Sequence, residues 1–101
     1  MSTFFSLYKF ALYFAMLFNA GAATEASGLI TDGKSKEPLS NVYVYTVKAE
    51  EETLSNDKGN FKLLSWQALP VTIVFEKNGY KSKRISLKQD EKNIRVLLEP
   101  N

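Results

Sequence analysis

The stretch Val42-Tyr43-Val44-Tyr45-Thr46, VYVYT, consists only of β-branched and aromatic residues, and the two types alternate. Such residues favour β-strands, in which successive side chains point to opposite faces of a sheet. Val42 and Val44 are therefore expected to face a core, and Tyr43 and Tyr45 to lie on the outer face. Similar segments lie on both sides of it, separated by turn residues, so the predicted strands are residues 28–32, 42–48, 53–56, 60–64, 71–75, 80–87 and 93–99. Short strands at this spacing predict an all-β fold, a seven-stranded antiparallel β-sandwich.

The same period of two assigns the core. One mutually consistent set of residues is expected to point inward, while polar residues between them, such as Lys62 and Arg95, face water. The predicted inward set is Ile30, Val42, Val44, Phe61, Leu63, Val71, Ile73, Phe75, Ile85, Leu87, Ile94, Val96 and Leu98. The chain contains no cysteine, so this apolar burial has to stabilise the fold without disulfides.

The N-terminus is typical of a secretory signal peptide. Lys9 is the only charged residue before the apolar run FALYFAMLF (residues 10–18), and the small residues Ala20-Gly21-Ala22 form an A-x-A cleavage site. The run is well short of the ~20 residues that span a bilayer, although an uncleaved anchor is the alternative. We expect a helical signal peptide at residues 1–23 and one exported domain at residues 24–101. That domain is predicted to be exported, and not to be an integral membrane protein after cleavage.

Charge gives little reason to expect nucleic acid as a partner. The chain has 13 basic and 11 acidic residues and a net charge of +2, whereas nucleic-acid-binding domains present a basic face. Lys81, Lys83 and Arg84 are the one basic cluster. They are interpreted as a solvated strand face, whose charges would discourage pairing if the strand lies at a sheet edge.

The stretch NDKGNF, residues 56–61, raises the question of a metal loop or a turn. A calcium loop places oxygen ligands at alternate positions over a dozen residues and ends in a bidentate Glu. This stretch has one carboxylate and a Lys inside it. We predict a hairpin turn in which Gly59 has a positive φ and Asp57 accepts hydrogen bonds from backbone amides. Gly79 is expected to act likewise before Tyr80, whose ring should cap one end of the core.

Residue types exclude most catalytic chemistry. Without histidine or cysteine there is no His general base, thiol nucleophile or zinc site of the usual kind. The acidic residues Glu50 to Glu52 are consecutive in a predicted bend, where carboxylates are usually exposed and ionised, and a glycosidase would need two acids across a cleft. We therefore expect no enzymatic activity, no catalytic residues, no cofactor and no metal.

Four stretches together resemble the carboxypeptidase regulatory-like domain family: GLITDGKSKEPLSNVYVYT, LSNDKGNFKL, VFEKNGYKSKRISL and IRVLLEP, within residues 27–100. The resemblance implies a transthyretin-like or prealbumin-like sandwich in bacterial envelope proteins. It also implies an association with TonB-dependent outer-membrane receptors, which often carry such a domain at their N-terminus. Together with the signal peptide, the resemblance implies a domain that is periplasmic, or outer-membrane-associated or extracellular, in a Gram-negative bacterium. The peptidase activity of neighbouring catalytic domains does not carry over, because it needs His ligands.

The candidate binding residues are aromatic. Tyr43 and Tyr45 are expected on one outer face, and Trp66 in a loop between strands. Exposed aromatic rings can contact a partner or stack on a sugar, but cross-strand packing explains the tyrosines equally, and folding over a core edge explains Trp66. The predicted function is protein–protein interaction with an envelope or outer-membrane protein. The alternative is a small carbohydrate-binding module using Tyr43, Tyr45 and Trp66.

Overall fold

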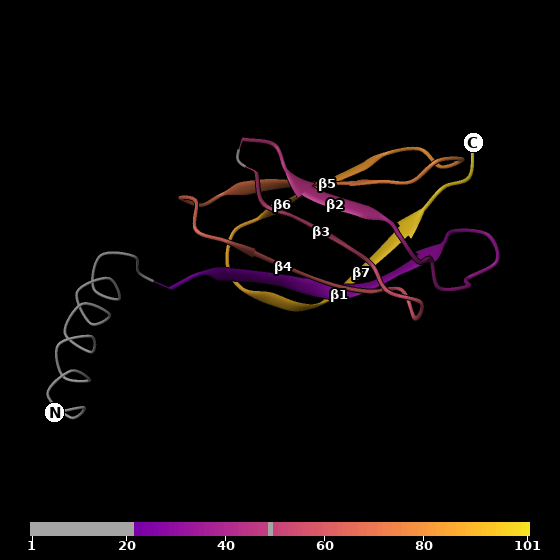
Figure 1. Ribbon diagram of the computed structural model, residues 1–101, viewed down its shortest axis with the longest axis horizontal. Coiled ribbons are helices and arrows are strands. Elements are labelled where there is room, and N and C mark those ends of the chain that lie inside the picture. The colour runs from indigo at the N-terminus through magenta and orange to yellow at the C-terminus, as the bar shows by residue number, and fades with distance from the viewer. Residues whose placement is uncertain (1–21, 49) are drawn as a thin grey trace, which may run out of the picture.

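The computed structural model describes residues 22–48 and 50–101, in which seven strands form two sheets (Figure 1). The three-stranded sheet has the order β4 (Asn60–Ser65), β1 (Thr24–Asp32), β7 (Glu91–Leu98). The four-stranded sheet has the order β3 (Glu52–Leu54), β2 (Tyr43–Thr46), β5 (Val71–Glu76), β6 (Lys83–Leu87). The two sheets form the layers of a sandwich, so the all-β prediction is confirmed. Residues 1–21, which hold nearly all of the predicted signal peptide and its helix, lie outside the described residues.

The predicted all-antiparallel arrangement is wrong for one pair of strands. β1 pairs with β7 in parallel, with an irregularity in register between Ala26 and Gly28, while the pairs β1–β4, β2–β3, β2–β5 and β5–β6 are antiparallel. Parallel neighbours need a long crossover connection. Here the chain passes through the whole four-stranded sheet before β7 returns to β1. The alternation of apolar and polar residues within one segment does not indicate whether the neighbouring strand runs parallel or antiparallel to it.

The predicted inward set forms the core. All of its members are buried except Ile85 and Ile94, which are partly buried against it. The rings of Phe61 and Phe75 meet edge to face, 5.3 Å apart at 83°, and join the two sheets. Three further buried hydrophobic residues were not predicted: Ala26, Leu39 and Val74.

β7 runs beside β1 so closely that residue 28 has no room for a side chain. A β-carbon on Gly28 would overlap the carbonyl oxygen of Ile94 and lie 2.7 Å from both its carbonyl carbon and its amide nitrogen. Glycine inside a strand often marks such an approach. Gly28 therefore permits the parallel pairing of β1 and β7.

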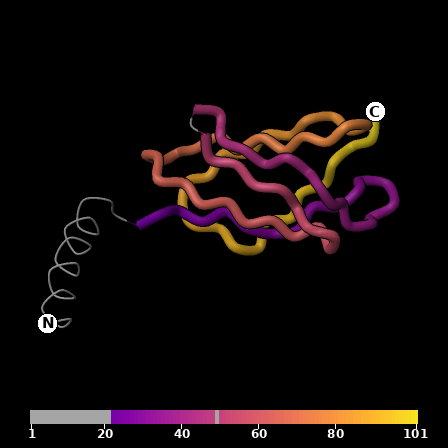
Figure 2. Tube along the Cα trace, viewed as in Figure 1, coloured from indigo at the N-terminus to yellow at the C-terminus, as the bar shows by residue number. Residues whose placement is uncertain are grey.

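The turn at residues 56–60 is confirmed, but the hairpin is not. Gly59 has the expected positive φ, 79°. The side chain that closes the turn is Asn56 rather than Asp57: its Oδ1 accepts from the amides of Lys58 (3.0 Å) and Asn60 (2.9 Å). The flanking strands β3 and β4 belong to different sheets, so the chain changes layer here, as Figure 2 lets the reader follow.

The hydroxyls of Ser55 and Tyr80 connect loops to the two sheets through hydrogen bonds. The Ser55 hydroxyl, which is buried, accepts from the Val42 amide (2.9 Å) and donates to the Leu39 carbonyl (2.7 Å). Tyr80 packs against the core as predicted, and its hydroxyl donates to Asp32 Oδ2 at 2.6 Å. No helix in the described part of the chain is long and apolar enough to cross a membrane.

Candidate interaction surface

The two candidate tyrosines lie side by side on the outer face of β2. Their rings are stacked, with centroids 4.7 Å apart and planes 28° apart. The Tyr43 hydroxyl donates to Glu52 Oε1 on β3 (2.6 Å), and the Tyr45 hydroxyl donates to Glu76 Oε2 on β5 (2.9 Å). These hydrogen bonds, together with partial desolvation, raise the pKa of both phenols. Both hydroxyls are donors, and the hydrogen bonds hold the two side chains in one arrangement.

One residue on the outer side of β5, Val74, is also buried. Tyr45 and Arg84 lie directly opposite Val74 on either side of it, and Val74 is buried although it points away from the core. Long side chains can cover apolar surface in this way while their polar ends stay in water. The outer face thus has an apolar centre that the alternation of the sequence does not reveal.

Leu54 extends this apolar surface to the sheet edge. It lies directly opposite Tyr43, and the two side chains are 58% and 39% exposed. With Glu52 and Thr53 they line a shallow hollow of about 440 Å³. We call the surface formed by Tyr43, Tyr45, Glu52, Leu54 and Glu76 the tyrosine face. It combines exposed apolar area with two carboxylates fixed by hydrogen bonds.

Trp66 lies apart from the tyrosine face. It directly follows β4 in the three-stranded sheet, and 57% of its surface is exposed. The hollow that it lines, about 380 Å³, is formed with residues 50–53 and 62–64. Residues 50–52 also line a hollow below Tyr43 and Tyr45. The three candidate residues therefore form two neighbouring surfaces, separated by the glutamate bend.

Glu51 differs from the exposed carboxylate that the sequence predicted, because it is partly buried. Its Oε2 accepts from the Trp66 amide (3.0 Å), and its Oε1 accepts from Gln67 Nε2 (2.8 Å) and Thr46 Oγ1 (3.4 Å). Burial alone would raise the pKa of Glu51, but these hydrogen bonds lower it overall. The carboxylate connects the bend to the loop after β4, which is a structural role.

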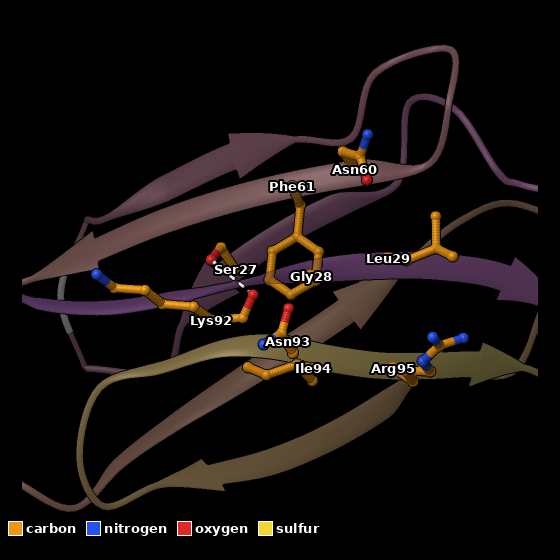
Figure 3. A pocket seen from close by; sticks show the side chains of 9 residues that line it. All are labelled: Ser27, Gly28, Leu29, Asn60, Phe61, Lys92, Asn93, Ile94 and Arg95. Carbon is orange, nitrogen blue, oxygen red and sulfur yellow. Dashed lines mark hydrogen bonds between the residues drawn. The ribbon is translucent and has the colours of Figure 1, made fainter.

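A hollow beside Gly28 is the feature that the sequence did not indicate as a site (Figure 3). It measures about 410 Å³ and is lined by residues 27–29, 60–61 and 92–95. Phe61 and Ile94 provide apolar contact, and Lys92 and Arg95 carry charges of the same sign. Ser27 Oγ donates to Glu25 Oε2 (2.9 Å), and the Lys92 carbonyl oxygen lies 3.4 Å from the same hydroxyl. Gly28 was predicted as the first residue of a strand, and only the structure places it inside β1, so no signal in the sequence indicated this hollow.

Two further observations concern the polar side chains of the described residues. In residues 22–48 and 50–101 no three Asp or Glu side chains are grouped so that they could hold a metal ion. Every buried side-chain nitrogen or oxygen of the same residues has a hydrogen-bond partner. On the tyrosine face, Glu52 and Glu76 fix the hydroxyls of Tyr43 and Tyr45. The face therefore offers exposed apolar area beside two carboxylates, with Arg84 beyond Val74 on the same side of the sheet.

Comparisons with known proteins concern the family and the fold. The CarboxypepD_reg-like domain family matches residues 26–101. The comparison with curated proteins gave no match. Two similar solved structures are mutants of a type II cohesin–X-dockerin complex from Acetivibrio cellulolyticus, one changed at the C-terminal and one at the N-terminal interface. The C-terminal mutant gives a TM-score of 0.57 at 17% identity over 74% of this chain and 56% of the matched chain. The N-terminal mutant gives a TM-score of 0.59 at 17% identity over 76% of this chain and 58% of the matched chain. This chain spans less than two thirds of either matched chain, and identity this low indicates a common fold only.

Proposed function

This chain belongs to the CarboxypepD_reg-like domain family, and from that premise we propose that it is a non-catalytic module that binds another protein in the bacterial cell envelope. The partner is an envelope or outer-membrane protein, such as a component of a receptor or transport system. The proposal includes the transthyretin-like form of the sandwich that the resemblance implies. It also includes export by residues 1–23, with residues 24–101 in the periplasm or at the outer membrane. N-terminal sequencing of the protein from an envelope fraction tests the export.

The observation that carries this proposal is the tyrosine face. Tyr43 and Leu54 leave a large part of their surfaces exposed next to each other. Tyrosine supplies large contact area with few rotatable bonds, and rings already held by hydrogen bonds lose little further freedom on binding. Glu52 and Glu76 favour a partner with basic residues around an apolar centre. That the two similar solved structures come from a protein–protein complex is consistent with this use of the fold.

Capture of a partner from an envelope extract, followed by mass spectrometry, tests the proposal. We expect the wild-type protein to retain a specific protein that the double variant Tyr43→Ser, Tyr45→Ser loses. Leu97→Ser is the matched control, because Leu97 is 43% exposed on the other sheet. Leu54→Ser provides a second variant at a side chain whose loss should leave the fold intact. A partner retained equally by all variants would contradict the assignment of this face.

Carbohydrate binding is the second candidate, and the exposure of Trp66 favours it. Indole rings stack on sugars, and more than half of the Trp66 surface is open. The stacking of Tyr43 on Tyr45 argues against a three-residue platform, since those ring faces are turned to each other. Trp66 is the only tryptophan of the chain, so its fluorescence reports directly on a titration with envelope polysaccharides. An unchanged emission spectrum would contradict carbohydrate binding at Trp66, and protein binding would be the one remaining proposal.

A further inference from the structure

We propose that copies of this chain associate head to tail, with β6 of one copy adding to β3 of the next as an antiparallel strand. This goes beyond the proposed function, because the partner is a second copy and the contact is made by the backbone edge of β3, whose residues Glu52 and Leu54 also belong to the tyrosine face. The four-stranded sheet has the order β3-β2-β5-β6, so β3 and β6 are its two edges. An exposed edge presents backbone groups that can pair with another strand.

The hydrogen-bond pattern identifies the outward backbone groups of β3. The Thr46 amide donates to the Glu51 carbonyl (3.1 Å), and the Ser55 amide donates to the Val42 carbonyl (3.1 Å). In an antiparallel ladder, alternate residues direct their N–H and C=O groups to the same neighbour. Residues 51, 53 and 55 therefore face β2. The backbone groups of Glu52 and Leu54 point away from the sheet.

The same alternation identifies the outward groups of β6. The Val47 amide donates to the Thr72 carbonyl (3.1 Å), so residues 72, 74 and 76 of β5 face β2 and residues 71, 73 and 75 face β6. Their partners in β6 are residues 87, 85 and 83. The backbone groups of Arg84 and Ser86 thus point outward. Each edge offers two residues to a new strand.

The two edges carry opposite charge. Glu50 and Glu52 are exposed at the start of β3, and Lys81, Lys83 and Arg84 are exposed at the start of β6. Like charges directly opposite each other on paired strands are destabilising, and unlike charges are stabilising. Pairing of two β3 edges or two β6 edges is therefore disfavoured, whereas pairing of β3 with β6 is favoured. The charges select one pairing instead of blocking all of them.

Strand direction fits this pairing. β3, β2, β5 and β6 alternate in direction, so β6 runs opposite to β3. A second copy displaced sideways without rotation would place its β6 antiparallel to β3 and continue the sheet. Glu52 and Arg84 lie on the same face, because Glu52 is opposite Tyr45, Tyr45 opposite Val74, and Val74 opposite Arg84. One register sets Arg84 directly against Glu52 of the next copy.

The contact is short, so we expect weak, reversible association. It leaves the tyrosine rings uncovered and repeats them in each copy, which would strengthen binding to a partner with several sites. A contact between unlike surfaces can continue from copy to copy and form open chains. The sedimentation coefficient of the protein should therefore rise steadily with concentration, without a plateau at the dimer.

Sedimentation velocity tests the proposal. At low salt the wild-type protein should associate as its concentration rises, and 0.5 M NaCl should reduce this association. Glu52→Lys or Arg84→Glu alone should weaken association by roughly tenfold, because repulsion replaces attraction. The double variant Glu52→Lys, Arg84→Glu should restore the association, because a positive charge on β3 then faces a negative charge on β6. Lys62→Glu and Glu91→Lys, which make the same charge changes on the other sheet, are the matched controls and should have no effect.

Two results would overturn the proposal: a protein that stays monomeric at every concentration at low salt, or a double variant that associates no better than the single variants. Urea denaturation checks that each variant is folded, and the salt dependence of the wild-type protein needs no variant. The double variant Tyr43→Ser, Tyr45→Ser should associate normally. Failure of self-association is thus distinguishable from failure of partner binding.

Discussion

Replacing Gly28 with alanine tests the close approach of the paired strands β1 and β7. The added β-carbon would overlap the Ile94 carbonyl oxygen and lie 2.7 Å from two further backbone atoms of that residue. All three atoms belong to the main chain of the neighbouring strand, so no side-chain rotation can relieve the overlap. From Ile94 to Leu98, β7 is paired with β1 from Gly28 to Asp32. Movement of β7 would therefore disturb this ladder.

The distances indicate the size of the effect. Ordinary contacts of a β-carbon begin at 3.4 Å, so the two atoms at 2.7 Å require a retreat of about 0.7 Å, and the carbonyl oxygen requires more. Overpacking a well-packed interior typically costs about 1–3 kcal/mol and sometimes more. Because strand pairing is disturbed as well, we expect Gly28→Ala to lower the free energy of unfolding by about 3 kcal/mol. Domains of this kind are stable by only about 5–15 kcal/mol in total.

Urea denaturation followed by circular dichroism measures this loss. Gly79→Ala is the matched control, because Gly79 has a φ of 89° but no atom within 4 Å of an added β-carbon. It should cost only the conformational penalty of about 1 kcal/mol. Equal losses in the two variants, or a Gly28→Ala protein within 0.5 kcal/mol of the wild type, would refute the steric argument.

Three further predictions concern side-chain hydrogen bonds. Ser55→Ala should lower the free energy of unfolding by about 1–3 kcal/mol in urea denaturation, because it leaves a backbone amide and a carbonyl without their buried partner. The hydrogen bond from Tyr80 holds the pKa of Asp32 below its ordinary value of 3.8, so its contribution is present above about pH 4 and is lost as the pH falls through the lowered pKa. Tyr80→Phe should accordingly reduce the loss of stability between pH 4 and pH 2, as measured by urea midpoints. Glu51→Ala should release the loop after β4 and shift the emission of Trp66, with far-ultraviolet circular dichroism unchanged.

The burial of most core residues could be predicted because a strand has one simple period. Once Val42 and Val44 are assigned inward, the faces of the other segments follow from apolar matching. The burial of Val74 could not be predicted in this way. Its position is outward, yet it is buried, because Tyr45 and Arg84 lie on either side of it. Cover from neighbouring strands depends on strand order, which the alternation within one segment does not specify.

Strand partners were the unpredictable part of the fold. The turn residues at 56–60 were recognisable, since glycine adopts a positive φ at little cost. Whether the chain leaves a turn within the same sheet or in the other sheet depends on which apolar face it meets next. Here Gly59 lies against β1: its carbonyl accepts from the Ile30 amide at 2.8 Å, which directs β4 to the three-stranded sheet. This contact joins residues far apart in the sequence, and no local pattern encodes it.

The candidate site follows the same division. The outward direction of Tyr43 and Tyr45 was predictable from the strand that contains them, but the glutamates that fix their hydroxyls come from 9 and 31 residues away. The meaning of Lys83 and Arg84 likewise changes with strand order. On a central strand they would carry a large desolvation cost, whereas on β6 they lie at an edge of a sheet whose other edge is acidic. A basic edge by itself deters pairing, but a basic and an acidic edge on the same sheet deter only pairing between like edges. Any account of how this module avoids uncontrolled aggregation must therefore treat β3 and β6 together.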